Sequence, residues 1–154
     1  MTRSEQLYLE DLYAGQRFES RSHTLDIEQI KRFATDFDPQ PFHTDEEAAK
    51  DSFFGSLAAS GWHTAAMTMR MIVEGRKALG AANSLGSPGV DELRWLHPVY
   101  PGDTLRVESE VMEVRPSRSR PNMGLIRSNL AVFNQHGDKV MTFVSIELVP
   151  RREC

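Results

Sequence analysis

The second half of the chain contains four long runs in which apolar and polar residues alternate, preceded by one long helical pattern. The runs span residues 90–99, 103–114, 124–134 and 139–149. The alternation is clearest in the last run, at Val140, Thr142, Val144, Ile146 and Leu148, and it is typical of a sheet with one covered face. The turn sequence NQHGDK joins the last two runs and predicts an antiparallel hairpin. An antiparallel sheet curled around the helix is the economical way to bury these elements, which predicts an α+β fold.

The helical pattern covers about residues 61–77. Its apolar face carries Trp62, Ala66, Met69 and Val73, which recur at the spacing of an amphipathic helix. His63 falls on the opposite, polar stripe, so we expect it at the surface or in an interface.

Two further details concern strands. Residues 15–25 alternate moderately and predict a first strand before the helices. The apolar register shifts between Val111 and Met112, which indicates a β-bulge.

Composition narrows the class of protein. With 154 residues, the chain fits one domain spanning 1–154. Its net charge of −4 argues against nucleic-acid binding, which requires an excess of Lys and Arg. The single cysteine, Cys154, cannot form an internal disulfide, and the first residues lack an apolar signal segment, so we expect a cytoplasmic protein. The apolar helical stretch is interrupted by Arg70 and is too short to cross a membrane.

A rigid loop follows the first helical pattern. Asp26 can cap a helix over residues 27–37. In the next segment, DPQPF, Asp38 and Gln40 each precede a proline. A residue before proline is pushed out of the helical region, so we expect both to be extended and the helix to end near Phe37.

His43 stands at the end of this loop. Thr44, with Glu47 three residues later, matches a capping box opening a short helix over residues 45–52. His43 is therefore predicted to be held between a proline-rigid loop and a capped helix, five residues from Asp38.

A carboxylate and an imidazole so held suggest a metal pair, a pair that activates a nucleophile, or a general acid/base pair. No further set of ligands stands at metal-binding spacing, so we expect no metal, and the motifs of serine hydrolases, P-loop NTPases and Rossmann enzymes are absent. Asp38 and His43 could both contact a single water. The alternative is structural, with Asp38 as a turn residue and His43 in a local hydrogen bond.

Ser60 and Gly61 stand at the start of the long helix. The first amide N–H groups of a helix lack partners and lie at the positive end of its dipole. Glycine lets a ligand oxygen approach the backbone closely, so the position suits a carbonyl that gains charge during a reaction. A simple N-cap explains the same residues equally well.

Together these features resemble the MaoC-like hydratase/dehydratase family, the R-specific enoyl-CoA hydratases of the hotdog fold. Positions that match its first motif in register are Asp38, Pro41, His43, Asp45, Phe54, Gly55 and Gly61. The later segment HPVYPGDTLRVESEV, residues 97–111, resembles the family's entry into a strand. The chain departs from the motif at Phe37, Gln40 and Ser60, where the family has Gly, Asn and His.

The resemblance implies a single hotdog domain that hydrates a 2-enoyl thioester, with coenzyme A or a carrier protein as the thioester partner. Asp38 and His43 would bind and activate the water and deliver the proton, and which of them is the acid stays open. Gly61 N–H would polarise the carbonyl, and Ser60 and Gln40 are further candidates for substrate binding. No metal or redox cofactor is implied, and hotdog relatives imply a homodimer or a multiple of dimers.

Two rival functions share the fold. A hotdog thioesterase would direct water to the carbonyl carbon, usually with one carboxylate and no partnered histidine. A non-catalytic subunit that binds acyl thioesters would tolerate the loss of Asp38 or His43. Both residues are present, so the sequence favours the hydratase.

Overall fold

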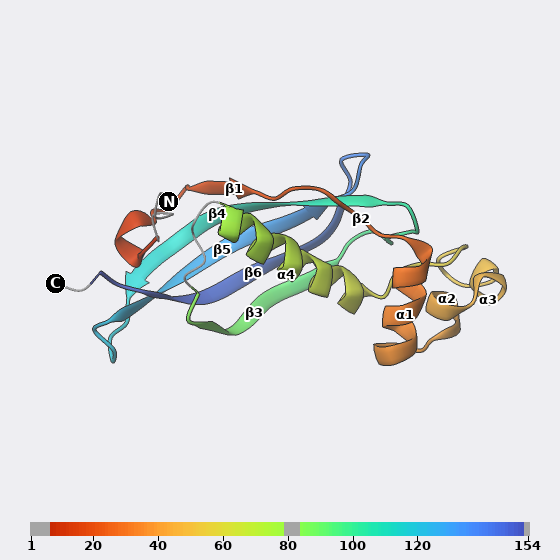
Figure 1. Ribbon diagram of the computed structural model, residues 1–154, viewed down its shortest axis with the longest axis horizontal. Coiled ribbons are helices and arrows are strands. Elements are labelled where there is room, and N and C mark those ends of the chain that lie inside the picture. The colour runs from red at the N-terminus through yellow and green to blue at the C-terminus, as the bar shows by residue number, and fades with distance from the viewer. Residues whose placement is uncertain (1–6, 79–83, 153–154) are drawn as a thin grey trace.

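A curled antiparallel sheet packs around one long helix in the computed structural model, which describes residues 7–78 and 84–152 (Figure 1). The strands are β1 (Arg17–Glu19), β2 (His23–Thr24), β3 (Gly86–Trp95), β4 (Thr104–Pro116), β5 (Met123–Phe133) and β6 (Lys139–Pro150). The helices are η1 (Leu9–Asp11), α1 (Ile27–Phe37), α2 (Pro41–Thr44), α3 (Glu46–Lys50) and α4 (Gly61–Ala78). The sheet order is β1-β4-β5-β6-β3, with β2 beside β4. This arrangement confirms the predicted α+β hotdog fold.

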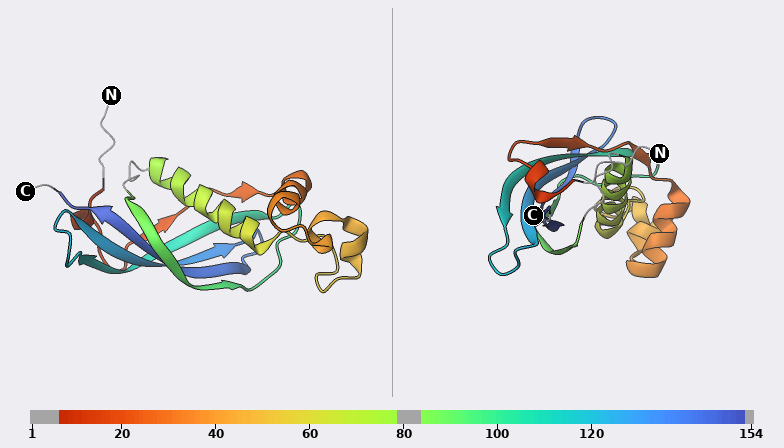
Figure 2. Two further views of the ribbon diagram at one scale, coloured as in Figure 1. Left: turned by 90° about the horizontal axis from the view of Figure 1, so that it is seen from below. Right: turned by 60° about the vertical axis from the view of Figure 1, so that its left-hand side comes forward.

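The main core lies between α4 and the sheet. Figure 2 shows the sheet curling around α4, while α1, α2 and α3 gather at the N-terminal end of that helix. Met67 and Met71 of α4 pack with buried strand residues such as Leu105, Val132 and Met141. Burial of this apolar surface is the main force that holds the helix in the sheet.

The expected faces of α4 are corrected by the structure. The helix buries His63, Thr64, Met67, Thr68 and Met71, whereas large side chains of the predicted apolar face are exposed. The exposed set is Trp62, Met69 and Val73. Thr68 fits the core because its hydroxyl finds a partner on the helix: it donates to the Thr64 carbonyl at 2.7 Å. The large apolar side chains of the exposed set therefore do not contribute to this core.

His63 is buried rather than exposed, contrary to the prediction. Its ring stacks on Phe33 with centroids 4.6 Å apart and an interplanar angle of 9°. Burial, and then the charge of His23, lower the pKa of His63. The ring therefore serves as a flat, neutral packing element between α1 and α4.

The covered face of β6 is also the opposite of the predicted one. The buried residues that alternate along it are Met141, Phe143, Glu147 and Val149, with half-buried Ser145 in the same phase. The even-numbered positions from Thr142 to Leu148 are only half-buried. The pattern failed because the face that meets the interior carries a serine and a glutamate, so it looks less apolar than the outer face.

The predictions for α1 and its exit are confirmed. The helix spans Ile27–Phe37, and Asp26 caps it by accepting a hydrogen bond from Gln29 N at 2.8 Å. Gln40 is extended, with φ −86° and ψ 143°. Asp38 leaves the helical region, as expected of a residue before proline, but its φ of −150° and ψ of 67° are not those of the predicted extended conformation.

The predicted capping box at Thr44 is wrong. Pro41 starts the one-turn helix α2, a position that proline favours, and Thr44 ends that turn with its hydroxyl donating to the Gln40 carbonyl. The cap of α3 is the next residue, Asp45, whose side chain accepts from Glu47 N at 2.9 Å. His43 therefore lies on a short helix rather than before one.

Strand boundaries agree in part with the sequence. The expected first strand is divided into β1 and β2. The β4–β5 pairing shifts register between Val111 and Glu113, which confirms the predicted bulge. The run at 90–99 forms a strand only to Trp95, and β3 begins before that run, at Gly86.

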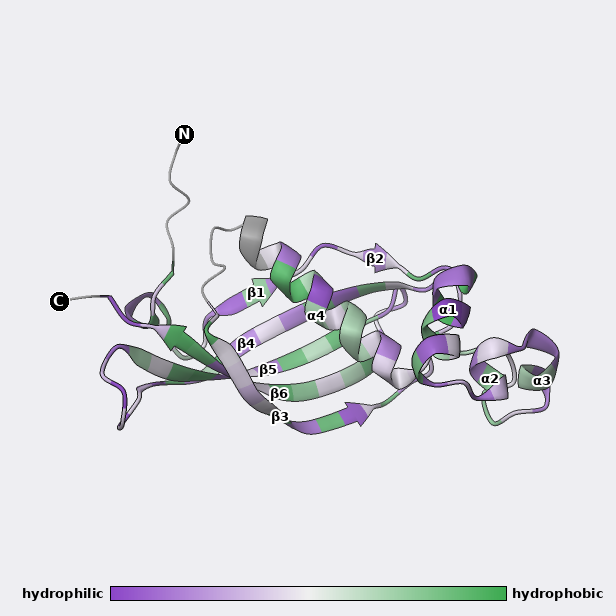
Figure 3. Ribbon diagram, turned by 60° about the horizontal axis from the view of Figure 1, so that its bottom comes forward, coloured by the Kyte–Doolittle hydropathy of each residue, from purple (hydrophilic) through white to green (hydrophobic). Residues whose placement is uncertain are grey.

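One edge of the sheet is uncovered. β3 is the terminal strand beside β6 (Figure 3), and nearly all of its residues are exposed. Val90 and Trp95 of this strand are 47% and 44% exposed. An exposed edge with apolar side chains is a surface that proteins normally cover. No helix among the described residues is long and apolar enough to span a bilayer.

Candidate active site

Asp38, Gln40, His43, Ser60 and Gly61 come together at the N-terminal end of α4. Asp38 ends α1, and its amide donates to the Ala34 carbonyl at 2.8 Å. The proline-restricted turn into α2 then points His43 back toward Asp38, while the chain after α3 returns to place Ser60 directly before α4. The structure thus gathers all five predicted residues in one place.

Two donors hold the Asp38 carboxylate. Gln40 Nε2 donates to Oδ1 at 2.6 Å, and Ser60 Oγ donates to Oδ2 at 2.7 Å. Burial raises the pKa of Asp38, but the hydrogen bonds from Ser60 and Gln40 and the nearby His43 outweigh burial and lower the pKa below its ordinary value. Asp38 is therefore a carboxylate at neutral pH.

His43 is oriented by a single backbone contact. Its Nδ1 lies 2.6 Å from the Ala58 carbonyl oxygen, and because a carbonyl only accepts, Nδ1 must carry the proton. Nε2 lies 3.4 Å from Asp38 Oδ2. The histidine side chain is 6% exposed and the aspartate side chain 18%. Phe42 and Phe54 pack against the ring, so it has little freedom to turn.

This geometry leaves two acceptors side by side. In the neutral ring, Nε2 presents a lone pair toward a carboxylate that is also only an acceptor. The 3.4 Å separation is longer than a good hydrogen bond. One small donor such as water can hydrogen-bond to Nε2 and Oδ2 together, which makes the pair suited to binding and deprotonating a water.

Gly61 offers the opposite polarity. Its amide donates to none of the described residues, as expected at the first position of a helix. Ser60 Oγ accepts from the next amide, Trp62 N, at 3.3 Å. A free N–H at the positive end of α4 therefore lies one residue from the hydroxyl that binds Asp38.

Trp95 is a site residue that the sequence analysis did not identify. Its Nε1 donates to the Gly61 carbonyl at 2.9 Å. A Cβ on Gly61 would lie 2.5 Å from Trp95 Cε2, closer than real contacts. Glycine is thus required at position 61 for close approach of the indole as well as for access to the amide. No sequence signal links two residues 34 positions apart.

A cavity of about 340 Å³ lies elsewhere, between the later turns of α4 and the sheet. Its walls include Met69 and Ile72 of α4 and Phe143 of β6. None of the five predicted site residues lines it. In residues 7–78 and 84–152, no group of three or more His, Cys, Asp or Glu side chains is placed to hold a metal ion.

Fold and site together define a class: a hotdog domain with a carboxylate–imidazole pair at the N-terminus of its central helix. The MaoC-like domain model matches residues 12–129. The chain therefore belongs to the MaoC-like family, as the sequence motifs predicted.

Three known proteins illustrate the relationship. A MaoC-like dehydratase from Rhodospirillum rubrum is 44% identical, with a TM-score of 0.87 over 96% of this chain and 99% of that one. The R-hydratase PhaJ1 from Pseudomonas aeruginosa is 26% identical, with a TM-score of 0.72 over 96% of this chain and 88% of that one. Mesaconyl-CoA hydratase from Cereibacter sphaeroides is 37% identical over 71 residues, which cover 46% of this chain and 20% of that protein. These relatives support a hydratase or dehydratase role.

Proposed function

We propose that this protein catalyses the reversible addition of water to a 2-enoyl thioester of coenzyme A, giving a 3-hydroxyacyl thioester. The observation that carries the proposal is the pair of acceptors, Asp38 Oδ2 and His43 Nε2, held 3.4 Å apart. Beside them lies the amide of Gly61, which donates to none of the described residues. The names of the relatives, which include a mesaconyl-CoA hydratase and an R-hydratase, support the reaction class.

The pair would act on one water. In the hydration direction, one of Asp38 and His43 takes a proton from the water as its oxygen bonds to C3 of the substrate. The electrons of the C2–C3 double bond move toward the thioester carbonyl, and the pair returns a proton to C2. The net change is the addition of H and OH, so the proposed reaction requires no redox cofactor.

Gly61 would stabilise the charge that develops on the thioester oxygen. Its amide points from the positive end of α4 and has no competing acceptor among the described residues. A preorganised donor of this kind stabilises an enolate more than the neutral carbonyl, because its dipole needs no reorganisation during the reaction. Ser60 and Gln40 would contribute indirectly by fixing the Asp38 carboxylate.

A thioesterase is the rival reaction at the same helix terminus. It needs one base aimed at the carbonyl carbon. It does not account for a second, buried acceptor on His43 whose tautomer is fixed by Ala58. The partnered histidine therefore favours hydration over thiol release.

We also propose that the protein is a cytoplasmic homodimer or a multiple of one. The uncovered edge strand β3 meets the exposed stripe on α4 where Trp95 packs on Trp62, with ring centroids 5.0 Å apart. The stripe and edge comprise Trp62, Met69, Val73, Val90 and Trp95. A second copy placed there would bury this surface and supply partners to the edge.

The test compares hydration with thiol release. Crotonyl-CoA and butyryl-CoA are offered to wild type, Asp38→Asn, His43→Gln and the double variant, with each reaction followed separately. Wild type should hydrate crotonyl-CoA, and each single change should lower turnover by at least about a hundredfold. The double change should add little, because groups that act as a unit are non-additive.

Asp36→Asn and His97→Gln are matched controls, since both residues are exposed and lie outside the pair. Both controls should keep wild-type turnover. Release of thiol from butyryl-CoA without hydration of crotonyl-CoA would establish the thioesterase instead. Near-normal hydration by folded Asp38→Asn would show that the pair is structural.

A further inference from the structure

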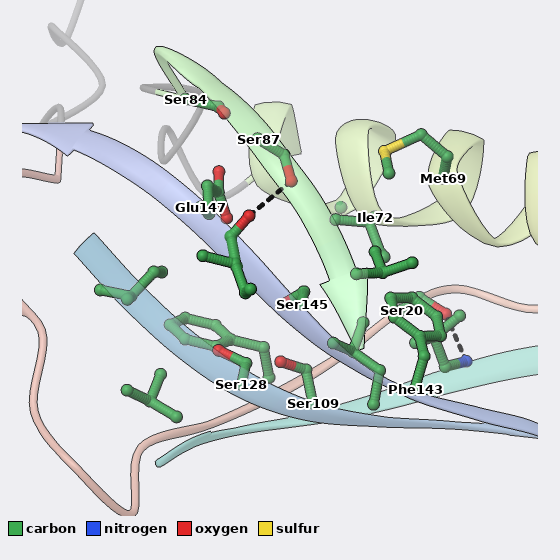
Figure 4. Close-up of a pocket in the computed structure, with 18 of the residues that line it drawn as sticks. Ser20, Met69, Ile72, Ser84, Ser87, Ser109, Ser128, Phe143, Ser145 and Glu147 are labelled. Carbon is green, nitrogen blue, oxygen red and sulfur yellow. Dashed lines mark hydrogen bonds between the residues drawn. The ribbon is translucent and has the colours of Figure 1, made fainter. Parts of the chain in front are cut away.

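The cavity under α4 is lined mostly by apolar side chains, with three serines on the sheet that forms its floor. Figure 4 shows Met69 and Ile72 above it and Ser109, Ser128 and Ser145 on the strands below. The three serines lie on the neighbouring strands β4, β5 and β6. Ser128 pairs directly with Ser145, while Ser109 lies diagonally from Ser128, whose partner on β4 is Val111.

These hydroxyls occupy positions where the sheet is otherwise apolar. On β4 the same face carries Val107 and Val111, and on β5 it carries Ile126 and Leu130, all of them buried. Strand alternation places the serines in the phase of these core residues. A hydroxyl on this face is costly unless it finds a partner, whereas an alanine of similar size would carry no such cost.

The three serine hydroxyls have no hydrogen-bond partner in the part of the chain that the structure describes. Ser128 is 5% exposed, and its hydroxyl makes no hydrogen bond with the described residues. The same holds for Ser109 and Ser145, and all three line the cavity. Glu147, two residues after Ser145 and 6% exposed, adds a buried carboxyl to the lining. Serine hydroxyls that line a cavity without a partner among the described residues indicate a ligand with matching polar atoms.

The cavity lies along α4 from the candidate active site. Gly61 and Met69 are eight residues apart on α4, which corresponds to about 12 Å along the helix. Met69 lines the cavity and is 51% exposed. At the N-terminal end of the helix, Trp62 packs on Trp95, whose indole donates to the Gly61 carbonyl. A chain bound at the Gly61 amide therefore has to extend by about 12 Å along α4 to meet the cavity lining at Met69.

We propose that the cavity receives the far end of the substrate's acyl chain and that Ser109, Ser128 and Ser145 select chains bearing a hydroxyl group there. This inference rests on the proposed hydratase function. A hydroxyl both donates and accepts, so it can pair with a serine row. The apolar walls hold the methylene chain. A chain that ends in a carboxylate is disfavoured, because burying a charge against apolar walls is costly.

Binding and turnover are measured with chains of one length. The unreactive probes are dodecanoyl-CoA, its ω-hydroxy analogue and its ω-carboxy analogue, compared by calorimetry. The reactive probes are the corresponding 2-enoyl thioesters. Wild type should bind and hydrate the ω-hydroxy chain about tenfold better than the unsubstituted chain, the worth of one good hydrogen bond, and should discriminate against the ω-carboxy chain.

Two variants test the serine row: Ser128→Ala, and a triple variant that adds Ser109→Ala and Ser145→Ala. In both, the affinity and the turnover for the ω-hydroxy chain should fall to about those for the unsubstituted chain, which is a ratio of about one. Ser52→Ala is the control, since its hydroxyl bonds only the backbone at Ala49 and Phe54, and it should keep the wild-type ratio. Equal binding of the chains by wild type, or a ratio that survives the triple change, would overturn the inference. Failure to hydrate any enoyl thioester, with the binding ratio intact, would overturn the proposed reaction and leave the chain-binding inference standing.

Discussion

The hydrogen bond from Ser60 to Asp38 should set the acid limit of activity. Ser60→Ala removes the donor that lies 2.7 Å from Asp38 Oδ2 and leaves Gln40 as the remaining side-chain donor to the carboxylate. Burial, which raises the pKa, is then opposed by fewer interactions. The pKa of Asp38 should therefore rise, and the acid limb of the kcat/KM profile should move to higher pH.

The size of the shift follows from the geometry. A hydrogen bond to a charged group contributes about 1.5–3 kcal/mol, and one pKa unit corresponds to about 1.4 kcal/mol. The Asp38 side chain is 18% exposed, so solvent screens the bond only weakly. Ser60→Ala should raise the pKa of Asp38 by about one to two units.

The same change affects stability in a defined direction. A depressed carboxyl pKa stabilises the fold above the unfolded value, and this stability is lost as pH falls through the folded value. Ser60→Ala should reduce that contribution. It also removes the cap on Trp62 N, which costs about 1 kcal/mol at any pH.

The assay is the pH dependence of kcat/KM for crotonyl-CoA hydration, paired with a carboxyl NMR titration of Asp38. Ser52→Ala is the control, because it loses two hydrogen bonds of similar length without touching a carboxylate. Its acid limb should coincide with that of wild type. An unshifted limb and an unshifted Asp38 titration in folded Ser60→Ala would refute the reasoning.

Three other outcomes are expected. Because burial lowers the pKa of His63, the free energy of unfolding should fall as pH drops below about 6.5, the ordinary histidine pKa. His63→Phe keeps a ring against Phe33 and should flatten this pH dependence in urea unfolding, whereas an unchanged pH dependence would contradict the reasoning. Gly61→Ala should lower thermal stability by about 1–3 kcal/mol, since its Cβ meets the Trp95 ring; much of the loss should return in Gly61→Ala/Trp95→Ala, whereas equal stability of Gly61→Ala and wild type would argue against the contact. Sedimentation should give a dimer or larger for wild type and a monomer for Val73→Asp; a monomeric, active wild type would refute the assembly.

The structure gives Gly61 a second role. The sequence predicts only that glycine at position 61 lets a ligand oxygen approach the backbone. The structure shows that any side chain there first meets Trp95. Lost activity in a Gly61 variant therefore reports on helix packing and on the amide together, and the pH profile of Ser60→Ala is the cleaner probe of the site.

The sequence by itself determined the features that depend on near neighbours. Helix α1 and its Asp26 cap, the exit at Asp38, and the bulge after Val111 follow from local backbone preferences. The Asp38–His43 pair was predictable because two prolines restrict the five-residue connection between them. The antiparallel sheet around one helix followed from the order and period of the runs.

Only the tertiary structure decided which faces are buried and which distant residues meet. The apolar phases of α4 and β6 were assigned to the core, yet the interior received Thr64 and Thr68 from the helix and Ser145 and Glu147 from the strand. Periodicity reports where apolar residues recur, but it does not say whether a sheet, a second copy or a ligand will cover them. The Trp95–Gly61 contact and the Ser60–Asp38 bond join residues 34 and 22 positions apart. Such contacts exist only because the sheet curls around α4 and carries its N-terminus to the loop that holds the pair.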